Sequence, residues 1–425
     1  MEYTKMTRED LQKELDLCLK LYEEEKAKGL KLDLSRGKPS PAQLDLSNKV
    51  MDTLNSESVL KSLNGMDLRN YGGLDGIPEA KELFAEILDT QPENVFAGGN
   101  SSLTIEFDII AHAMIDGLDG CEPWMNVKDR KWLCPAPGYD RHFNMTEHFG
   151  FELITVPMNN DGPDMDIVEE LVANDPSIKG IWAVPKYQNP MGISFSDEVV
   201  RRFASMKTAA KDFRIFWDNA YVVHDLYADK QDMILEIISE CEKAGYPDRV
   251  YEFTSTSKMA FPGSGIACVA TSVDNMKDLK ACWTYAMIGP DKVNQMRQVL
   301  FFKNKENVEK HMQVLANMLR PKFEKVLEVF DRDLDGLGIA SYTRPLGGYF
   351  ISFDAMEGCA SKAVAMCKDA GVVFTNAGAT FPYGKDPKDK NVRIAPSFAT
   401  LEEIEKAASL FTLCVRIVSL KKLLA

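Results

Sequence analysis

The chain has 425 residues, of which 45% are hydrophobic and 27% charged, a balance typical of a globular protein with a large core and two domains. Its formal net charge of -14, from 64 acidic and 50 basic residues, argues against nucleic acid as a partner but leaves room for a local basic pocket that binds small anions. The nine cysteines contain no CxxC pair and there are only five histidines, so neither a zinc site nor a disulfide framework is expected.

The N-terminal segment is charged throughout, without an apolar signal core, and no apolar run reaches the length of a membrane span. We therefore expect a cytoplasmic protein with reduced, mostly buried thiols and no membrane partner. The first predicted element is an amphipathic helix over residues 7–28, with Thr7 and Asp10 as a capping box and Gly29 at its end. A loop rich in proline and serine follows it, "LDLSRGKPSPAQLDLS".

From about residue 90 the pattern becomes strand, turn and helix, repeated. Several strand candidates are continuous apolar runs, as strands buried on both faces should be. The candidates are 94–97, 131–134, 151–156, 178–184, 213–217, 250–254 and 266–271. Helical stretches separate most of them, which predicts an α/β domain with a mostly parallel, seven-stranded sheet. The connection between the last two is too short for a crossover helix, so this pair is expected to be antiparallel.

The second half of the chain ends in a different pattern. A long helical section is expected over residues 291–330, and the tail over 340–425 mixes short strands with helices. This tail predicts a smaller α+β domain that the N-terminal residues complete. The predicted division is an N-terminal segment and part of the small domain over 1–55, a large domain over 56–310 and a C-terminal small domain over 311–425.

Polar turns follow five of the predicted strands. In parallel α/β sheets ligands bind at the carboxyl ends of the strands, so these turns should converge at one edge of the sheet. In chain order they are "GGNSSL", "PAPGYDR", "PKYQNPMG", "WDNAY" and "STSK". Each of them offers a different chemical group to a ligand.

The glycine turn "GGNSSL" opens a helix, where free backbone N–H groups and the helix dipole suit a phosphate. The alternative is an N-cap by Ser101 or Ser102. Asp218 ends an apolar strand, where a carboxylate could cap a helix or pair with a protonated ring nitrogen. Tyr221 lies three residues on and could reach the same ligand.

Three more residues complete a chemical set. Tyr139 could stack on a ring or simply pack, and Asn189 could be no more than a turn residue before proline. Lys258 lies in a tight turn of small residues, where desolvation can lower the pKa of an amine and let it form a Schiff base with an aldehyde. A phosphate cradle, a ring-nitrogen carboxylate, a stacking aromatic ring and a Schiff-base lysine together describe a pyridoxal phosphate site.

With this ordered set, the chain resembles the fold-type I, pyridoxal-phosphate-dependent aminotransferases, and within them the divergent aspartate aminotransferases called subgroup Ic. The resemblance spans residues 30–400 and is carried by "LDLSRGKPSPAQLDLS", "NYGGLDGIPEAKELFAEIL", "GGNSSL", "PAPGYDRHF", "PKYQNPMG", "WDNAYVVHDL", "TSTSK" and "NVRIAPSF". It implies a large cofactor-binding domain and a homodimer with shared active sites. The implied reaction is L-aspartate:2-oxoglutarate amino transfer by a ping-pong mechanism.

The resemblance also implies a role for each matching residue toward the cofactor. Lys258 would hold the cofactor and, once the substrate displaces it, would move the proton of the substrate Cα. Asp218 would keep the pyridine nitrogen protonated. Asn189 and Tyr221 would bind the phenolic oxygen, and Tyr139 would stack on the ring. Ser101 and Ser102, with the backbone at Asn100, would hold the phosphate, helped by Ser255 and Ser257. Tyr71 would reach the phosphate of the neighbouring subunit.

For the substrate, the resemblance implies a bidentate pair between Arg393 and the α-carboxylate, with Gly37 letting the backbone approach closely. A dicarboxylic substrate needs a second cation, for which Arg141 is the first choice and Arg36 the second. The alternative for each of these two arginines is an ordinary structural ion pair.

One departure concerns the phosphate. The family's usual arginine shortly after the lysine is absent from "KMAFPGSGIA", which leaves Lys292 and Arg297 as candidate charge partners. The alternative functions are an aminotransferase of aromatic amino acids or kynurenine, and a cysteine-conjugate β-lyase. A transcription regulator with an aminotransferase-like domain is disfavoured, because only about 30 residues precede the first motif and the chain is acidic.

Overall fold

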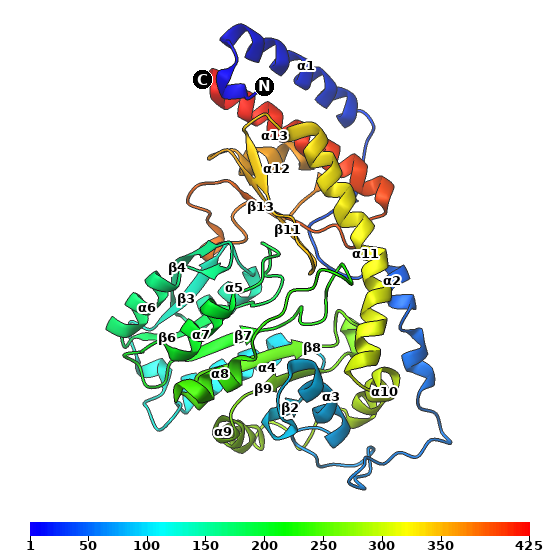
Figure 1. Cartoon of the computed structure of the whole chain (residues 1–425), viewed down its shortest axis with the longest axis vertical. Coiled ribbons are helices and arrows are strands. Elements are labelled where there is room, and N and C mark those ends of the chain that lie inside the picture. The colour runs from blue at the N-terminus through cyan, green and yellow to red at the C-terminus, as the bar shows by residue number, and fades with distance from the viewer.

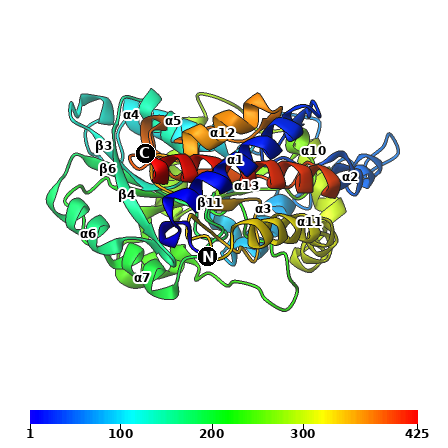
Figure 2. The same cartoon turned by 90° about the horizontal axis from the view of Figure 1, so that it is seen from above.

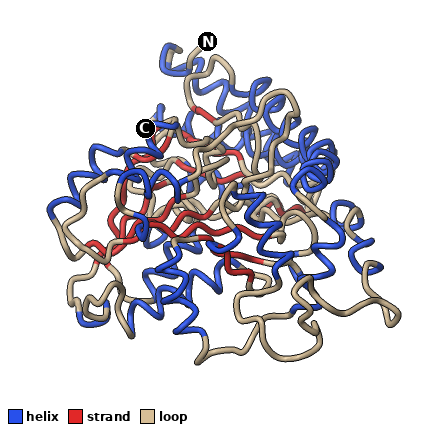
Figure 3. The backbone as a smooth tube through the Cα atoms, turned by 60° about the horizontal axis from the view of Figure 1, so that its bottom comes forward, coloured by secondary structure: helices blue, strands red, loops and turns tan.

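The computed structural model describes all 425 residues, and its centre is an eight-stranded mixed sheet (Figure 3). From one edge to the other its strands are β2 (Val95–Ala97), β9 (Ala267–Ala270), β8 (Val250–Ser255), β7 (Arg214–Asp218), β6 (Ile178–Ala183), β3 (Lys131–Ala136), β4 (Glu152–Asn159) and β5 (Gly162–Pro163). The pairings from β8 to β4 are parallel, whereas β2, β9 and β5 join the sheet through antiparallel pairs.

All seven predicted strands are present, with ends within three residues of the predicted ones. The antiparallel pairing predicted for the last two is confirmed, with Phe253 of β8 opposite Val269 of β9. The sheet has one strand more than the seven predicted. This strand, β5, has only two residues and pairs with the end of β4 across a tight turn, so it is too short to produce a periodic pattern.

Helices cover both faces of the sheet and bury a separate apolar core on each. One face carries α3 (Pro78–Leu88), α6 (Met165–Asn174), α7 (Asp197–Ser205), α8 (Ile237–Ala244) and α10 (Lys292–Phe302), and the other carries α4 (Ser102–Ile115), α5 (Asp140–His148) and α9 (Val273–Trp283). Successive strand residues point to opposite faces. Leu133 and Trp217 therefore join the first core, whereas Trp132 and Phe216 join the second.

The small domain lies at one end of the large sheet and holds both chain termini (Figure 1). Its antiparallel sheet has the order β10 (Ala340–Tyr342), β11 (Ile351–Ala355) and β13 (Asn391–Ile394). A second, parallel pair joins β1 (Leu32–Asp33) to β12 (Val372–Val373). Beside them lie α12 (Ala360–Asp369) and α13 (Leu401–Leu424).

The N-terminal residues complete this domain, as predicted. Helix α1 (Arg8–Lys26) packs along α13, and Figure 2 shows the two helices crossing. Thr7 caps α1 and accepts a hydrogen bond from the backbone N–H of Asp10, which confirms the N-cap half of the predicted capping box. The carboxylate of Asp10 accepts from the hydroxyl of Thr7 rather than from its backbone N–H. The apolar face of α1, with Leu11, Leu15, Cys18 and Tyr22, is buried in the small-domain core.

A 30-residue helix, α11 (Lys305–Leu334), connects the two domains. Leu315 belongs to a core of the large domain and Leu319 to that of the small domain, so one helix takes part in both (Figure 1). The single helical section predicted over 291–330 is wrong in one respect. The chain breaks between α10 and α11 at Lys303, which has φ 66°, and Asn304 caps the new helix.

The remaining regular elements are short. Helix α2 is Pro41–Asp45, and seven 3₁₀ turns are Tyr3–Lys5, Asn48–Asp52, Pro92–Asn94, Trp124–Asn126, Pro247–Arg249, Pro262–Ser264 and Pro382–Gly384. None of the helices combines the length and the apolar character that crossing a bilayer requires. The domain boundaries at residues 55 and 310 stay a prediction.

Candidate active site

A cavity of about 560 Å³ lies where the polar turns after the strands meet the small domain. Residues of the large domain line one side, and residues of the N-terminal segment and of β13 line the other. Nine of the residues predicted from the sequence line it: Arg36, Gly37, Tyr139, Arg141, Asn189, Asp218, Tyr221, Lys258 and Arg393. The convergence of turns that the strand pattern predicted therefore holds for these residues.

Lys258 lies in the turn after β8, half-buried at the cavity. The turn is fixed by Thr256, whose N–H donates to the carbonyl of Ile266 and whose hydroxyl accepts from the N–H of the same residue. The ammonium nitrogen of Lys258 lies 4.9 Å from the centre of the Tyr221 ring. Burial lowers the pKa of Lys258, although Asp218 and a second carboxyl act in the opposite direction. The direction agrees with the one predicted from the enclosed turn.

Asp218 ends β7 and is 5% exposed. Its Oδ2 lies 3.1 Å from Nε2 of His142, whereas its Oδ1 is buried without any hydrogen-bond partner in the protein. A helix does not begin at Asp218, so the N-cap alternative fails. The second carboxyl near Lys258 is that of Glu106, whose Oε2 lies 3.5 Å from the same Nε2.

His142 and Glu106 were not among the residues predicted from the sequence. His142 lies on α5, three residues after Tyr139, and its ring stacks on Trp182 with 4.2 Å between the centroids. Burial opposes the charged form of His142, but the carboxylates of Glu106 and Asp218 raise its pKa to about 9. A fully buried glutamate within the apolar run "LTIEFDII" was the available sequence signal.

Arg393 projects from β13 and is buried. Its Nη1 donates to Oδ1 of Asp140 at 2.9 Å and to Oδ1 of Asn189 at 3.3 Å, while its Nε has no partner. The guanidinium lies over the ring of Phe350, 4.9 Å from its centre. The same ring explains Gly37, because a Cβ at this position would lie 2.4 Å from a carbon of Phe350.

The predicted phosphate turn starts α4, with Ser101 at the N-cap position. Its side chain makes no capping hydrogen bond, so its hydroxyl is not committed to the helix. This turn lies against the lysine turn, because the hydroxyl of Ser257 donates to the carbonyl of Asn100 at 3.0 Å. Asn100 also donates through its amide to the carbonyls of Pro262 and Gly263.

Five predicted phosphate ligands are not part of the cavity lining: Asn100, Ser101, Ser102, Ser255 and Ser257. Tyr71 is also outside it and is 80% exposed. Lys292 is buried, and its ammonium donates to the carbonyl of Gly72 at 2.9 Å, so it supports the backbone next to Tyr71. Arg297 does not line the cavity, and its Nε is buried without a partner.

The two candidate side-chain arginines, Arg141 and Arg36, are both exposed at the cavity, and neither forms an ion pair with a carboxylate of the chain. The structural ion pair considered as the alternative is thus absent for both. A third cation, Lys38, was missed. It lines the same cavity, with its ammonium 4.2 Å from the centre of the Phe398 ring.

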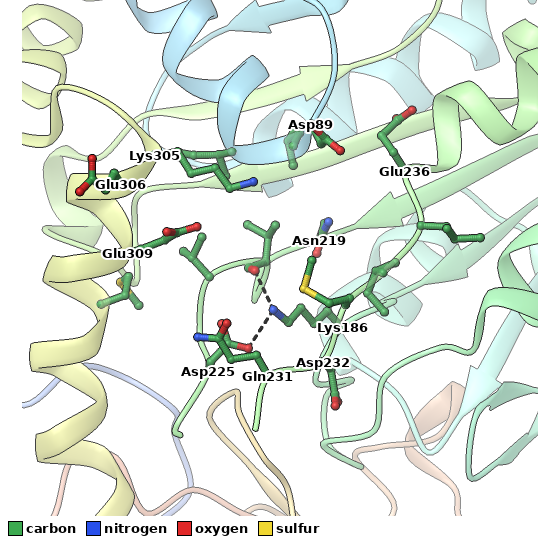
Figure 4. Close-up of a pocket in the computed structure, with 18 of the residues that line it drawn as sticks. Asp89, Lys186, Asn219, Asp225, Gln231, Asp232, Glu236, Lys305, Glu306 and Glu309 are labelled. Atoms are coloured by element: carbon green, nitrogen blue, oxygen red, sulfur yellow. Dashed lines mark hydrogen bonds and ion pairs between the residues drawn. The ribbon is translucent and has the colours of Figure 1, made fainter. Parts of the chain in front are cut away.

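A second cavity, of about 400 Å³, lies on the other side of the end of β7 (Figure 4). Helix α11 forms one wall, and the loop after β7 forms another. Lys186 donates there to the carbonyl of Val222 at 3.0 Å and pairs with Asp225 at 2.9 Å. Asn219 lines this second cavity, and no residue lines both.

Comparison with known proteins identifies the architecture. Residues 6–425 match the family described as aspartate amino-transferase. An aspartate aminotransferase of Corynebacterium glutamicum is 46% identical over 395 residues, which cover 93% of this chain and 91% of the relative. The crystal structure of an aspartate transaminase from Corynebacterium glutamicum superposes with a TM-score of 0.97 at 43% identity, covering 100% of this chain and 99% of that chain.

A more distant structure, the kynurenine aminotransferase of Pyrococcus horikoshii in complex with PMP, shares the fold. Its TM-score is 0.74 at 18% identity, covering 95% of this chain and 94% of that chain. The large mixed sheet with its smaller domain is thus the fold-type I aminotransferase architecture. Within that class, the chain belongs to the aspartate aminotransferase family.

Proposed function

We propose that the protein is a pyridoxal-phosphate-dependent aminotransferase that moves the amino group of L-aspartate to 2-oxoglutarate by a ping-pong mechanism. Membership of the family supports the reaction class. The observation that carries the proposal is that one cavity is lined by Lys258, Asp218 and Arg393, the last two with buried polar atoms that no protein group satisfies. An amine for an aldehyde, an acceptor for a ring nitrogen and a cation for an α-carboxylate are the groups this chemistry needs.

The residues present fit pyridoxal phosphate. Oδ1 of Asp218 is a buried acceptor without a donor, and a protonated pyridine nitrogen would be a matching donor. The uncommitted hydroxyl of Ser101 at the N-terminus of α4 suits a phosphate. When bound, the cofactor supplies an aldehyde for amine exchange and a ring that withdraws electrons from the substrate Cα.

The side chains around the ring would then divide the work. Lys258 would carry the cofactor and, once displaced, would accept the proton of the substrate Cα, for which its lowered pKa suits it. Burial raises the pKa of Tyr221, so this residue stays a phenol and would donate to the cofactor's phenolic oxygen. Asn189 would bind the same oxygen, and Tyr139 would stack on the ring.

The phosphate would lie at the contact between the α4 turn and the lysine turn, held by Asn100, Ser101, Ser102, Ser255 and Ser257. Tyr71 would reach the phosphate of the neighbouring subunit in a homodimer, which its exposure and its support by Lys292 allow. The homodimer, the shared sites and the cytoplasmic location stay predictions.

For the substrate, Arg393 would bind the α-carboxylate through the guanidinium edge that Asp140 does not occupy. Gly37 would let the backbone reach the same carboxylate. Arg141, or alternatively Arg36, would bind the side-chain carboxylate, and their lack of ion pairs favours a dicarboxylic substrate over aromatic amino acids, kynurenine or a cysteine conjugate.

The test is the absorption spectrum of the purified holoenzyme before and after L-aspartate is added without a keto acid. We expect conversion of the bound cofactor to its amine form, with one equivalent of oxaloacetate released. The Lys258→Ala variant should bind the cofactor without covalent attachment and lose at least about 10³-fold in turnover. A wild-type spectrum that aspartate leaves unchanged would refute the substrate, and full activity of Lys258→Ala would refute the mechanism.

A further inference from the structure

The contacts of Glu106 call for an explanation beyond packing. Its side chain is 0% exposed, and neither of its oxygens has a hydrogen-bond partner. A buried carboxylate is costly unless a cation or several donors compensate it. The nearest charged group is the ring of His142, with Nε2 at 3.5 Å, and the same nitrogen lies 3.1 Å from Asp218.

No local structural role of Glu106 compensates the free-energy cost of burying its carboxyl. It lies in the second turn of α4, beyond the N-terminal residues whose N–H groups need capping. It pairs with no lysine or arginine of the chain. It lies four residues after Ser102, so the helix presents both on one face. One face of α4 thus carries a predicted phosphate ligand and the carboxyl behind Asp218.

The ring of His142 is held in place from two sides. It stacks on Trp182 with an interplanar angle of 7°, and Tyr139 meets it edge-on at 4.9 Å. Two carboxyls therefore converge on one nitrogen of a fixed imidazole. With both carboxyls ionised and the imidazole protonated, the three groups sum to a charge of −1, which leaves the cluster able to accept one further cation.

We propose that Glu106 is a positioning residue that keeps His142 protonated, so that Asp218 remains a carboxylate with Oδ1 directed to the cofactor's ring nitrogen. This inference rests on the proposed function and adds a residue to it. With Glu106 present, the carboxylates of Glu106 and Asp218 balance two cations, the imidazolium of His142 and the protonated ring nitrogen of the cofactor. Without it, both cations compete for the single carboxylate of Asp218, and the imidazole loses its proton.

The other titratable groups around the cluster act in known directions. Burial and, to a smaller extent, Asp218 raise the pKa of Glu106, while His142 and then Lys258 stabilise its ionised form. Tyr139, the N-cap residue of α5, also faces Asp218 and Glu106, and burial raises its pKa, so it stays neutral. No group other than the two carboxyls offsets the burial of His142.

The experiment is an NMR titration of the histidine side chains in the cofactor-free protein. The chain has only five histidines, so His142→Asn identifies the signal. We expect the wild-type His142 to titrate near pH 9 and Glu106→Gln to lower this midpoint by about one unit or more. Glu252→Gln is the matched control, because Glu252 is also fully buried at this edge of the sheet but has no histidine beside it, and it should leave the midpoint unchanged.

A second readout uses the holoenzyme. We expect Glu106→Gln to bind the cofactor at least tenfold more weakly and to lower kcat by about tenfold or more, with KM for aspartate within about threefold, because Glu106 does not touch the substrate cavity. A correctly folded Glu106→Gln protein in which His142 still titrates near pH 9 overturns the proposal. If the midpoint falls but the wild-type enzyme fails to transaminate aspartate, the proposed function fails while the coupling of Glu106 to His142 stands.

Discussion

Asp218 and Asn219 are consecutive residues at the end of β7, yet they face two different cavities. Each has a fully buried glutamate behind it, Glu106 for the first and Glu252 for the second. Asn219 donates to Glu252 at 2.9 Å, and no cation accompanies this pair. Burial, with Glu236 nearby, raises the pKa of Glu252 well above its usual range, which favours the neutral carboxyl.

The difference lies in one histidine. Both glutamates are equally buried, but His142 supplies a positive charge on the Asp218 side. Burial raises the pKa of both carboxyls, but only Glu106 has a base beside it that acts in the opposite direction. The two cavities also differ in the charge of their linings. Five cations and two carboxyls line the first, whereas three lysines and seven carboxyls line the second.

Exchanging the two side chains should give the largest effect. Asp218→Asn removes the acceptor for the ring nitrogen and should lower kcat by about 10²- to 10⁴-fold. Asn219→Asp instead places a carboxylate beside Glu252 without a cation, and it should lower the free energy of unfolding by about 1–3 kcal/mol while leaving cofactor binding intact. Steady-state kinetics and urea unfolding distinguish the two variants. Equal kinetic defects in both would remove the distinction between the cavities.

The free energy of unfolding should depend on pH through the protonation of His142. Its pKa is about 9 in the folded chain against about 6.5 when unfolded, so between these values the folded chain holds one proton more and stability falls as pH rises. The contribution is complete below pH 6.5 and, over a shift of this size, is on the order of 3 kcal/mol. The Tm should thus drop more between pH 6.5 and 9 in the wild type than in His142→Asn.

His224 provides the control for this prediction. Burial and the nearby charges of Lys258 and Lys186 lower the pKa of His224 to about 3, so it does not titrate between pH 6.5 and 9. His224→Asn should keep the wild-type pH dependence in that window. A His142→Asn protein with the full wild-type drop would show that the imidazole is not charged in the fold.

The excess of cations in the first cavity should appear in substrate selection. Arg141→Ala should raise KM for aspartate by about 10- to 100-fold, the cost of losing a charge-assisted pair, and should spare an amino acid without a side-chain carboxylate. Arg36→Ala and Lys38→Ala are the matched comparisons at the same cavity. If Arg36→Ala has the larger effect on KM, Arg36 rather than Arg141 binds the side-chain carboxylate of the substrate.

The smallest effect is expected at Glu252. Burial favours the neutral form of this carboxyl, and a glutamine keeps both its shape and an oxygen that can accept from Asn219. Glu252→Gln should therefore change kcat and KM by less than about twofold, since Glu252 does not line the first cavity. Stability should stay within about 1 kcal/mol of the wild type. A large loss of activity would mean that the second cavity takes part in the reaction.

The sequence was sufficient for the sheet and for the residues that end its strands. Buried parallel strands are continuous apolar runs, so their ends could be located, and with them Asp218, Lys258 and Tyr139. His142 and Glu106 were missed because they lie within helices, and their contact joins segments 36 residues apart that only the packing of α4 and α5 brings together. The break at Lys303 was missed because Lys303 itself carries no helix-stopping signal.

Seven of the nine free thiols are buried in the three cores, so that each core carries its own chemical reporter. The small-domain core holds Cys18, Cys359, Cys367 and Cys414, one face of the large sheet holds Cys241 and Cys268, and the other face holds Cys134. Burial raises the pKa of Cys134 and Cys268 well above the usual range, so these thiols are inert to alkylation in the native fold. The order in which they become labelled in denaturant would therefore show which layer of the molecule opens first, without any engineered probe.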